Sequence, residues 1–171
     1  MKSARRQFLH AGGAVALLGA LGIYSLSRRG GASEPAAFEV THTEEEWKKI
    51  LSPNAFQVLR KEATERPGSS PLNDEHRKGI FRCAGCELDL FSSETKFESG
   101  TGWPSFWQPL ANAVGTTTDR SFFMTRTEVH CRRCGGHLGH VFDDGPKPTG
   151  LRYCMNGVAL KFSPDAAGGP A

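Results

Sequence analysis

The sequence reads CAGC at residues 83–86 and CRRC at residues 131–134, two copies of the C-x-x-C pattern. Each copy can place two thiolates on one side of a tight turn, and two copies together commonly hold one structural zinc ion. Because the copies lie far apart in the chain, the metal would join distant parts of the fold. Two short-range disulfides and a redox-active C-x-x-C are the alternative interpretations.

The segments around these cysteines predict a mainly β domain of the α+β class. Short apolar runs alternate with glycine-containing loops that are too short for helical crossovers, so the sheet should be mostly antiparallel. The expected fold is a small antiparallel β-sheet domain with N-terminal helices and a structural four-cysteine zinc site. The expected strands cover residues 79–83, 89–91, 103–107, 121–129, 137–142, 151–155 and 158–162.

Two helices are predicted before the strands. Thr43 and Glu46 form a capping box, and the apolar spacing that follows is helical. Ser52 and Pro53 match a cap and a first helical residue, so a second helix should run to about Glu65. The folded domain is expected to span residues 43–163.

The first 32 residues are interpreted as a targeting segment. A charged start at 1–6 precedes an apolar run at 11–26, and RRQFL at residues 5–9 resembles a twin-arginine export signal. The protein is therefore expected to be exported, either periplasmic or anchored in the membrane and facing the periplasm, rather than cytoplasmic. Residues 33–42 read as a linker and 164–171 as a flexible tail.

The charge balance argues against nucleic acid as a partner. Residues 1–32 hold five of the 21 basic residues and none of the 18 acidic ones. The rest of the chain therefore carries 16 basic against 18 acidic residues, and it is not basic. Membrane association is expected only through the N-terminal segment, and a monomer is the default.

Cys154 is the fifth cysteine of the chain and has no partner in a C-x-x-C pair. A lone thiol beside a cation is a candidate nucleophile, although lone cysteines are more often inert and buried. In a strand, alternate residues share one face, so Arg152, Cys154 and Asn156 should lie together. His140 and Phe142 should do the same on a neighbouring strand.

Four motifs in order resemble methionine-R-sulfoxide reductases of the B type: FRCAGC at 81–86, SGTGWPSF at 99–106, CGGHLGHVF at 134–142 and GLRYCMN at 150–156. The resemblance spans about residues 43–162. It implies a peptide-methionine (R)-S-oxide reductase that acts on methionine R-sulfoxide, free or in proteins. Separate enzymes serve the two sulfoxide epimers. It also implies one structural zinc ion per chain, held by Cys83, Cys86, Cys131 and Cys134.

The resemblance implies that the Cys154 thiolate attacks the sulfoxide sulfur and becomes a sulfenic acid. The Arg152 charge is expected to lower the pKa of this thiol. His140 or His137 should protonate the sulfoxide oxygen, directly or through water. The remaining expected site residues are Asn156, which orients the polar network, and Trp103 and Phe142, which bind the substrate methyl group.

Several of these residues have simpler readings. Trp103 and Phe142 are also plausible core residues, and His137 is a plausible structural hydrogen-bonding group. Asp144 is expected to serve as a turn residue rather than as a partner of the site. His130 is expected to have a plain strand or surface role, although it lies next to Cys131 in the sequence.

Thr101 stands where many members of the resembled family carry a second, resolving cysteine. With four cysteines assigned to zinc, the expected cycle uses Cys154 alone, and an external thioredoxin-like thiol reduces the sulfenic acid. Two other functions remain open: a zinc-stabilised module that binds a protein or peptide without catalysis, and a general thiol peroxidase.

Overall fold

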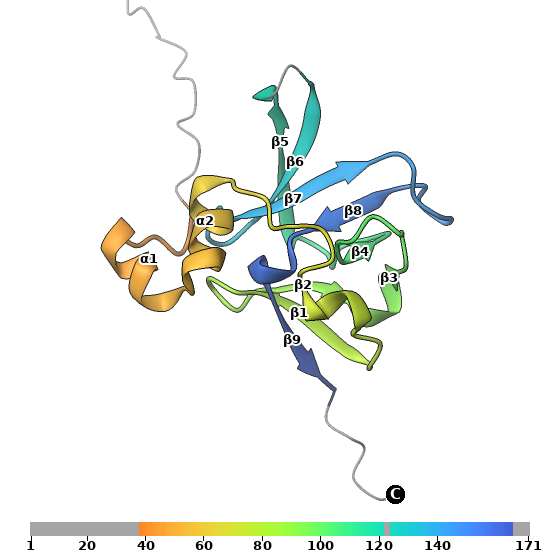
Figure 1. The fold of residues 1–171 in the computed structure, drawn as a ribbon, viewed down its shortest axis with the longest axis horizontal. Helices are drawn as coiled ribbons and strands as arrows, with labels where there is room; N and C mark the ends of the chain where they lie inside the picture. The colour runs from red at the N-terminus through yellow and green to blue at the C-terminus, as the bar shows by residue number, and fades with distance from the viewer. Residues whose placement is uncertain (1–37, 122–123, 166–171) are drawn as a thin grey trace, which may run out of the picture. The chain divides into compact units, whose positions relative to one another are not determined.

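The computed structural model describes residues 38–121 and 124–165 (Figure 1). The predicted targeting segment, the first half of the linker and the end of the tail lie outside these residues. Among the described residues, no helix combines the length and the apolar character needed to cross a membrane.

Two helices precede the strands, as the sequence predicts. Helix α1 (Glu44–Ile50) starts at the complete capping box of Thr43 and Glu46. Helix α2 (Pro53–Lys61) starts at Ser52, whose hydroxyl accepts a hydrogen bond from the Ala55 N–H. It ends earlier than the expected Glu65, because Glu62 takes a left-handed conformation with φ of 56°.

The strands form two antiparallel sheets, which confirms the predicted fold class (Figure 1). A three-stranded sheet has the order β2–β1–β9, and a six-stranded sheet has the order β3–β4–β8–β7–β6–β5. The smaller sheet contains β1 (Gly79–Cys83), β2 (Asp89–Ser92) and β9 (Leu160–Pro164). The larger contains β3 (Lys96–Phe97), β4 (Ser105–Phe106), β5 (Val114–Asp119), β6 (Arg126–Cys131), β7 (His137–Phe142) and β8 (Arg152–Met155). The part of the chain that the structure describes also contains the short 3-10 turns η1 (Pro71–Asp74), η2 (Ser93–Thr95) and η4 (Gly157–Ala159).

The strand predictions are close for β1, β2, β7 and β8, but β4 is shorter than the expected 103–107. The strand expected at 158–162 begins only at Leu160, because residues 157–159 form the turn η4. Strands β1 and β7 match their predicted bounds, whereas the single strand expected at 121–129 is wrong: β6 begins only at Arg126. Its partner β5 and the strand at the opposite edge, β3, have no counterpart among the predicted strands. Because β5 is an edge strand with mostly exposed threonines, its sequence lacks the apolar alternation that marks a half-buried strand.

The core lies between the two sheets and is built around three phenylalanines. Phe81 on β1, Phe91 on β2 and Phe106 on β4 are all fully buried. The Phe91 and Phe106 rings stack with centroids 4.4 Å apart, and Phe81 meets Phe106 edge to face at 4.9 Å. These contacts join the smaller sheet to β4, and β4 is the strand that pairs with the candidate nucleophile's strand β8.

Gly139 sets the spacing of β7 and β8. Its Cα faces the Cys154 carbonyl so closely that any added Cβ would collide with that oxygen. Only glycine therefore allows β7 to approach the backbone of Cys154 at this point.

We expect Gly139→Ala to push β7 away from β8 and to lower the free energy of unfolding by about 3 kcal/mol or more, because the added Cβ clashes with a backbone oxygen. Gly150→Ala is the matched control: a Cβ there meets open space, so the variant should lose only the about 1–2 kcal/mol that a left-handed backbone, φ 74°, costs a non-glycine residue. Urea unfolding of both variants checks this. Equal destabilisation of the two variants would contradict the steric argument.

Candidate functional site

Cys154 lies near the middle of the larger sheet, with a neighbouring strand on each side. On β4 it faces Ser105, and on β7 it faces His140. A cavity of about 150 Å³ opens beside it. The residues that line the cavity are Thr64, Trp103, Arg126, Gly139, His140, Phe142, Cys154 and Asn156.

This cavity brings together most of the site residues predicted from the sequence. Trp103, His140, Phe142, Cys154 and Asn156 all line it. His137 and Arg152 do not line the cavity. Each of them packs against a residue that does line the cavity. The centre of the His137 ring lies 5.4 Å from that of the His140 ring, and the Arg152 guanidinium lies 4.4 Å from the centre of the Phe142 ring.

The environment of the Cys154 thiol is less activating than the sequence suggested. Burial raises the pKa of Cys154 above its ordinary value. Thr101, Arg152 and Ser105 each act to lower this pKa, but together they do not offset burial. The expected lowering by Arg152 is therefore present as one contribution, and the expected net direction is wrong.

Asp144 binds Arg152 through two parallel hydrogen bonds, so its expected turn role is wrong. The distances are 2.8 Å from Arg152 Nε to Oδ1 and 2.8 Å from Nη2 to Oδ2. The turn in this connection occupies residues 147–149 instead. The hydrogen bonds from Arg152 lower the pKa of Asp144, and the carboxylate in turn fixes the guanidinium near Cys154 and over Phe142.

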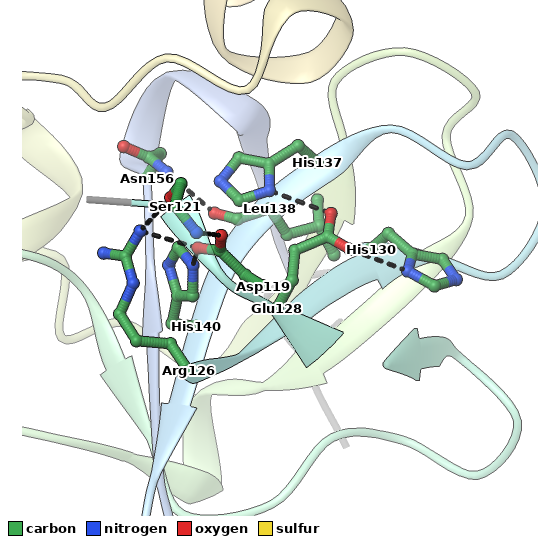
Figure 2. A network of polar contacts seen from close by, with 9 residues as sticks. All are labelled: Asp119, Ser121, Arg126, Glu128, His130, His137, Leu138, His140 and Asn156. Carbon is green, nitrogen blue, oxygen red and sulfur yellow. Dashed lines mark hydrogen bonds and ion pairs between the residues drawn. The ribbon is translucent and has the colours of Figure 1, made fainter. Parts of the chain in front are cut away.

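Each site histidine has a carboxylate partner that sequence reasoning missed (Figure 2). His140 Nε2 lies 2.8 Å from Asp119 Oδ2, and His137 Nδ1 lies 2.9 Å from Glu128 Oε1. Burial lowers the pKa of His140, although the bond to Asp119 acts in the opposite direction. Finding Asp119 from the sequence required the β5–β6 pairing, and β5 carried no strand signal.

Glu65 ties the two ends of the cavity together and was also missed. Its backbone carbonyl accepts a hydrogen bond from Trp103 Nε1 at 3.2 Å, and its N–H donates to Asn156 Oδ1 at 2.9 Å. The buried Asn156 amide also donates to the Leu138 carbonyl at 3.0 Å. Asn156 therefore anchors the wall of the cavity to β7.

The Glu65 carboxylate supports the turn that follows Asn156. It accepts hydrogen bonds from the N–H groups of Gly157 and Val158, at 2.6 and 3.0 Å. A Cβ at position 157 would collide with the Ser70 side chain, so a larger residue here would force Ser70 to move. No motif or periodicity in residues 62–70 indicated this role, because it consists of contacts with segments far away in the chain.

The four cysteines of the two C-x-x-C pairs converge on one point, as the sequence predicts. Their sulfurs all lie within 4.8 Å of one another. The sulfurs of Cys86 and Cys131 are 3.5 Å apart and those of Cys83 and Cys134 are 3.7 Å apart, far longer than a disulfide bond. Four sulfurs at about 2.3 Å from a tetrahedral ion would be about 3.8 Å apart, so the cluster fits a metal ion.

The cluster joins the two sheets. Cys83 ends β1 in the smaller sheet, and Cys131 ends β6 in the larger one. His130, next to Cys131, is outside the four-sulfur group; its Nδ1 lies 3.4 Å from Glu128 Oε2. A metal bound here would have no open coordination position, so it would act on the fold rather than on a substrate.

Comparison with known proteins adds an independent finding. Residues 51–164 match the model of the SelR domain family. The chain is 55% identical over 130 residues to a protein named peptide methionine sulfoxide reductase MsrB from Methanosarcina barkeri, covering 75% of this chain and 92% of that protein. Proteins of the same name from Leptospira interrogans and Bradyrhizobium diazoefficiens are 52% and 54% identical, over 73% and 74% of this chain and 96% and 91% of their own.

Metal removal should destabilise the whole domain, because the cluster holds the two sheets together. We expect Cys86→Ser, or chelation of the reduced protein, to cost at least about 4 kcal/mol, part of the roughly 10–16 kcal/mol that zinc gives small zinc-finger peptides. Thermal unfolding and elemental analysis measure this. Cys154→Ser is the control and should keep both the metal and the melting temperature; an unchanged melting temperature in Cys86→Ser would contradict the expectation.

Alkylation of Cys154 should report the charges around it. In the wild type, the midpoint of the pH dependence should lie above the ordinary thiol pKa of about 8.5, since burial disfavours the thiolate. Arg152→Gln removes a favourable cation and should raise the midpoint further. Asp143→Asn is the control on the same loop and should leave the midpoint unchanged. Mass spectrometry of iodoacetamide uptake at Cys154 measures the midpoint, and a lower midpoint in Arg152→Gln would refute this account.

Proposed function

The chain belongs to the SelR domain family, and we propose that it is a peptide methionine sulfoxide reductase of the MsrB type, specific for the R epimer of the sulfoxide. The observation that carries the proposal is the position of Cys154: one thiol outside the cysteine cluster, opposite His140 and at the wall of a small cavity with aromatic side chains. The high identity to proteins named for this activity supports the same reaction.

The reaction balances in protons within the site. The Cys154 sulfur attacks the sulfoxide sulfur and forms a transient sulfur–sulfur bond. The bond between the oxygen and the methionine sulfur then breaks, an oxygen bonds to the Cys154 sulfur, and the sulfur–sulfur bond breaks, so that methionine leaves and Cys154 remains as a sulfenic acid. The thiol loses one proton and the oxygen gains one, so the site has only to move a proton. Because burial favours neutral Cys154 and neutral His140, we infer that His140, opposite Cys154, passes this proton to the oxygen, directly or through water.

The cavity walls suit a methyl sulfoxide. Trp103 and Phe142 supply apolar surface for the methyl group, and the hydrogen bond from Trp103 Nε1 to the Glu65 carbonyl fixes the indole. Arg152 contributes through its charge, which favours a thiolate at Cys154, and by packing over Phe142. Asn156 holds the adjoining backbone. His137 packs edge to face against the His140 ring.

The sulfenic acid on Cys154 requires an external thiol. Thr101 Oγ1 lies 3.8 Å from Cys154 Sγ, at the place where a resolving cysteine would act. The other four cysteines belong to the cluster. The proposed reductant is therefore a thioredoxin-like protein, which attacks Cys154 directly and is itself oxidised to a disulfide.

We propose zinc as the metal of the cluster, because four thiolates in tetrahedral arrangement are the usual ligand set of structural zinc. The ion would supply stability alone. We further propose export to the periplasm, free or anchored through the N-terminal segment, and action as a monomer. The twin-arginine-like sequence at 5–9 supports export, and that route carries proteins that are already folded.

Turnover of resolved epimers tests the proposal. The wild type should reduce the R epimer at least about 100-fold faster than the S epimer, and Cys154→Ser should lose all activity while keeping the fold. Stoichiometric substrate followed by a sulfenic-acid trap should label Cys154. In Thr101→Cys the trap should find nothing, because the neighbouring thiol forms a disulfide with Cys154. A disulfide at Cys154 in the wild type would refute the one-cysteine cycle.

A further inference from the structure

His137 and His140 are held by carboxylates through opposite ring nitrogens (Figure 2). Asp119 on β5 contacts His140 at Nε2, and Glu128 on β6 contacts His137 at Nδ1. The two rings lie side by side on β7, with centroids 5.4 Å apart. Both carboxylates come from strands on the side of β7 away from Cys154, and Glu128 is the residue directly opposite His140 in the β6–β7 register.

These contacts determine where the ring protons lie. An ionised carboxylate accepts hydrogen bonds and cannot donate them, so the ring nitrogen that faces it carries the proton. Burial opposes ionisation of Glu128, but its bonds to His130 and His137 outweigh burial and lower its pKa to about 2. The Ser121 backbone N–H, followed by the Ser121 side chain and His140, holds the pKa of Asp119 well below its usual range.

We propose that Asp119 and Glu128 are positioning residues that fix the tautomers of the two site histidines. Asp119 keeps the proton of His140 on Nε2, so Nδ1 is the only nitrogen that this ring can offer to a molecule in the cavity. Glu128 keeps the proton of His137 on Nδ1, so Nε2 carries the lone pair. The inference rests on the proposed function for its catalytic meaning, because a bare Nδ1 on His140 is what a proton acceptor opposite Cys154 requires.

Asp119 is itself held rigidly. The N–H of Ser121 donates to its Oδ1 at 2.8 Å, and Arg126 Nη2 donates at 2.6 Å to Oδ2, the same oxygen that accepts from His140. Arg126 faces Asp119 directly across the β5–β6 pair and also lines the cavity. The hairpin therefore connects the cavity wall to Nε2 of His140.

His137 gives a second, independent indication. Its side chain is only 4% exposed, and within the described residues its Nε2 has no hydrogen-bond partner. A buried nitrogen without a partner costs free energy unless water or a ligand satisfies it. With Glu128 holding Nδ1, this Nε2 is a fixed acceptor beside His140, suited to binding a water molecule that takes part in the proton transfer.

The ¹⁵N spectra of the histidine rings test the inference in the full-length protein without substrate. In the wild type, His140 should be in the Nε2–H form and His137 in the Nδ1–H form. Asp119→Asn should mix the forms of His140 alone, and Glu128→Gln those of His137 alone, because an amide can either donate or accept. Each variant should lower kcat at least about tenfold, as removal of groups that orient ligating histidines does, with KM changed less than about threefold.

Asp89→Asn is the matched control. Asp89 pairs with Arg82 across the antiparallel strands β1 and β2, as Asp119 pairs with Arg126 across β5 and β6, but it is remote from the cavity. This variant should match the wild type in ring spectra and in kcat. Reversed tautomers in the wild type would overturn the inference, as would a kcat within twofold of wild type in both Asp119→Asn and Glu128→Gln.

The two hypotheses fail separately. A wild-type protein that does not reduce the R-sulfoxide overturns the proposed function, whereas its ring spectra still decide where the protons lie. If a variant does not fold, the wild-type spectra alone decide the tautomers.

Discussion

The register of β8 between β4 and β7 is the constraint on which the site depends. It places Ser105, Cys154, His140 and Glu128 in one row across four adjacent strands. In a sheet, a slip of one residue moves every side chain to the opposite face. The thiol, its proton partner and the carboxylate behind them therefore stay together only while this register holds, and the close approach at Gly139 allows β7 and β8 to keep it.

Burial and charge act against each other around the nucleophile. Burial raises the pKa of Cys154 and lowers that of His140, so the resting site favours a neutral thiol and a neutral imidazole. Charged side chains near both groups are held in place by ion pairs: Asp144 binds Arg152, which favours the Cys154 thiolate, and Arg126 binds Asp119, which contacts His140. A thiol that stays protonated until substrate arrives is protected from indiscriminate oxidation, while the charges needed for its ionisation are already in place.

Stability and chemistry are assigned to different cysteines. The four-sulfur cluster ties β1 of the smaller sheet to β6 of the larger one, and β6 also carries Glu128. The cluster thus supports the strand from which His137 is positioned, although it offers no open ligand position for a substrate. Glu65 plays a similar supporting part at the other end of the cavity, where one loop residue fixes both Trp103 and Asn156.

The sequence by itself determined the chemistry: the paired cysteines, the lone Cys154, the aromatic residues and histidines of the cavity, and the central strands all carry local signals. Capping boxes and apolar alternation are written in consecutive residues, so α1, β1 and β7 could be predicted. Only the tertiary structure decided which residues act on these groups. Asp119 lies on an edge strand without alternation, Asp144 resembled a turn residue, and Glu65 lies in a loop. The pKa of Cys154 is shifted upward, whereas the sequence predicted a downward shift. Burial causes the difference, and burial is a property of the packed fold that the neighbouring residues in the sequence do not reveal.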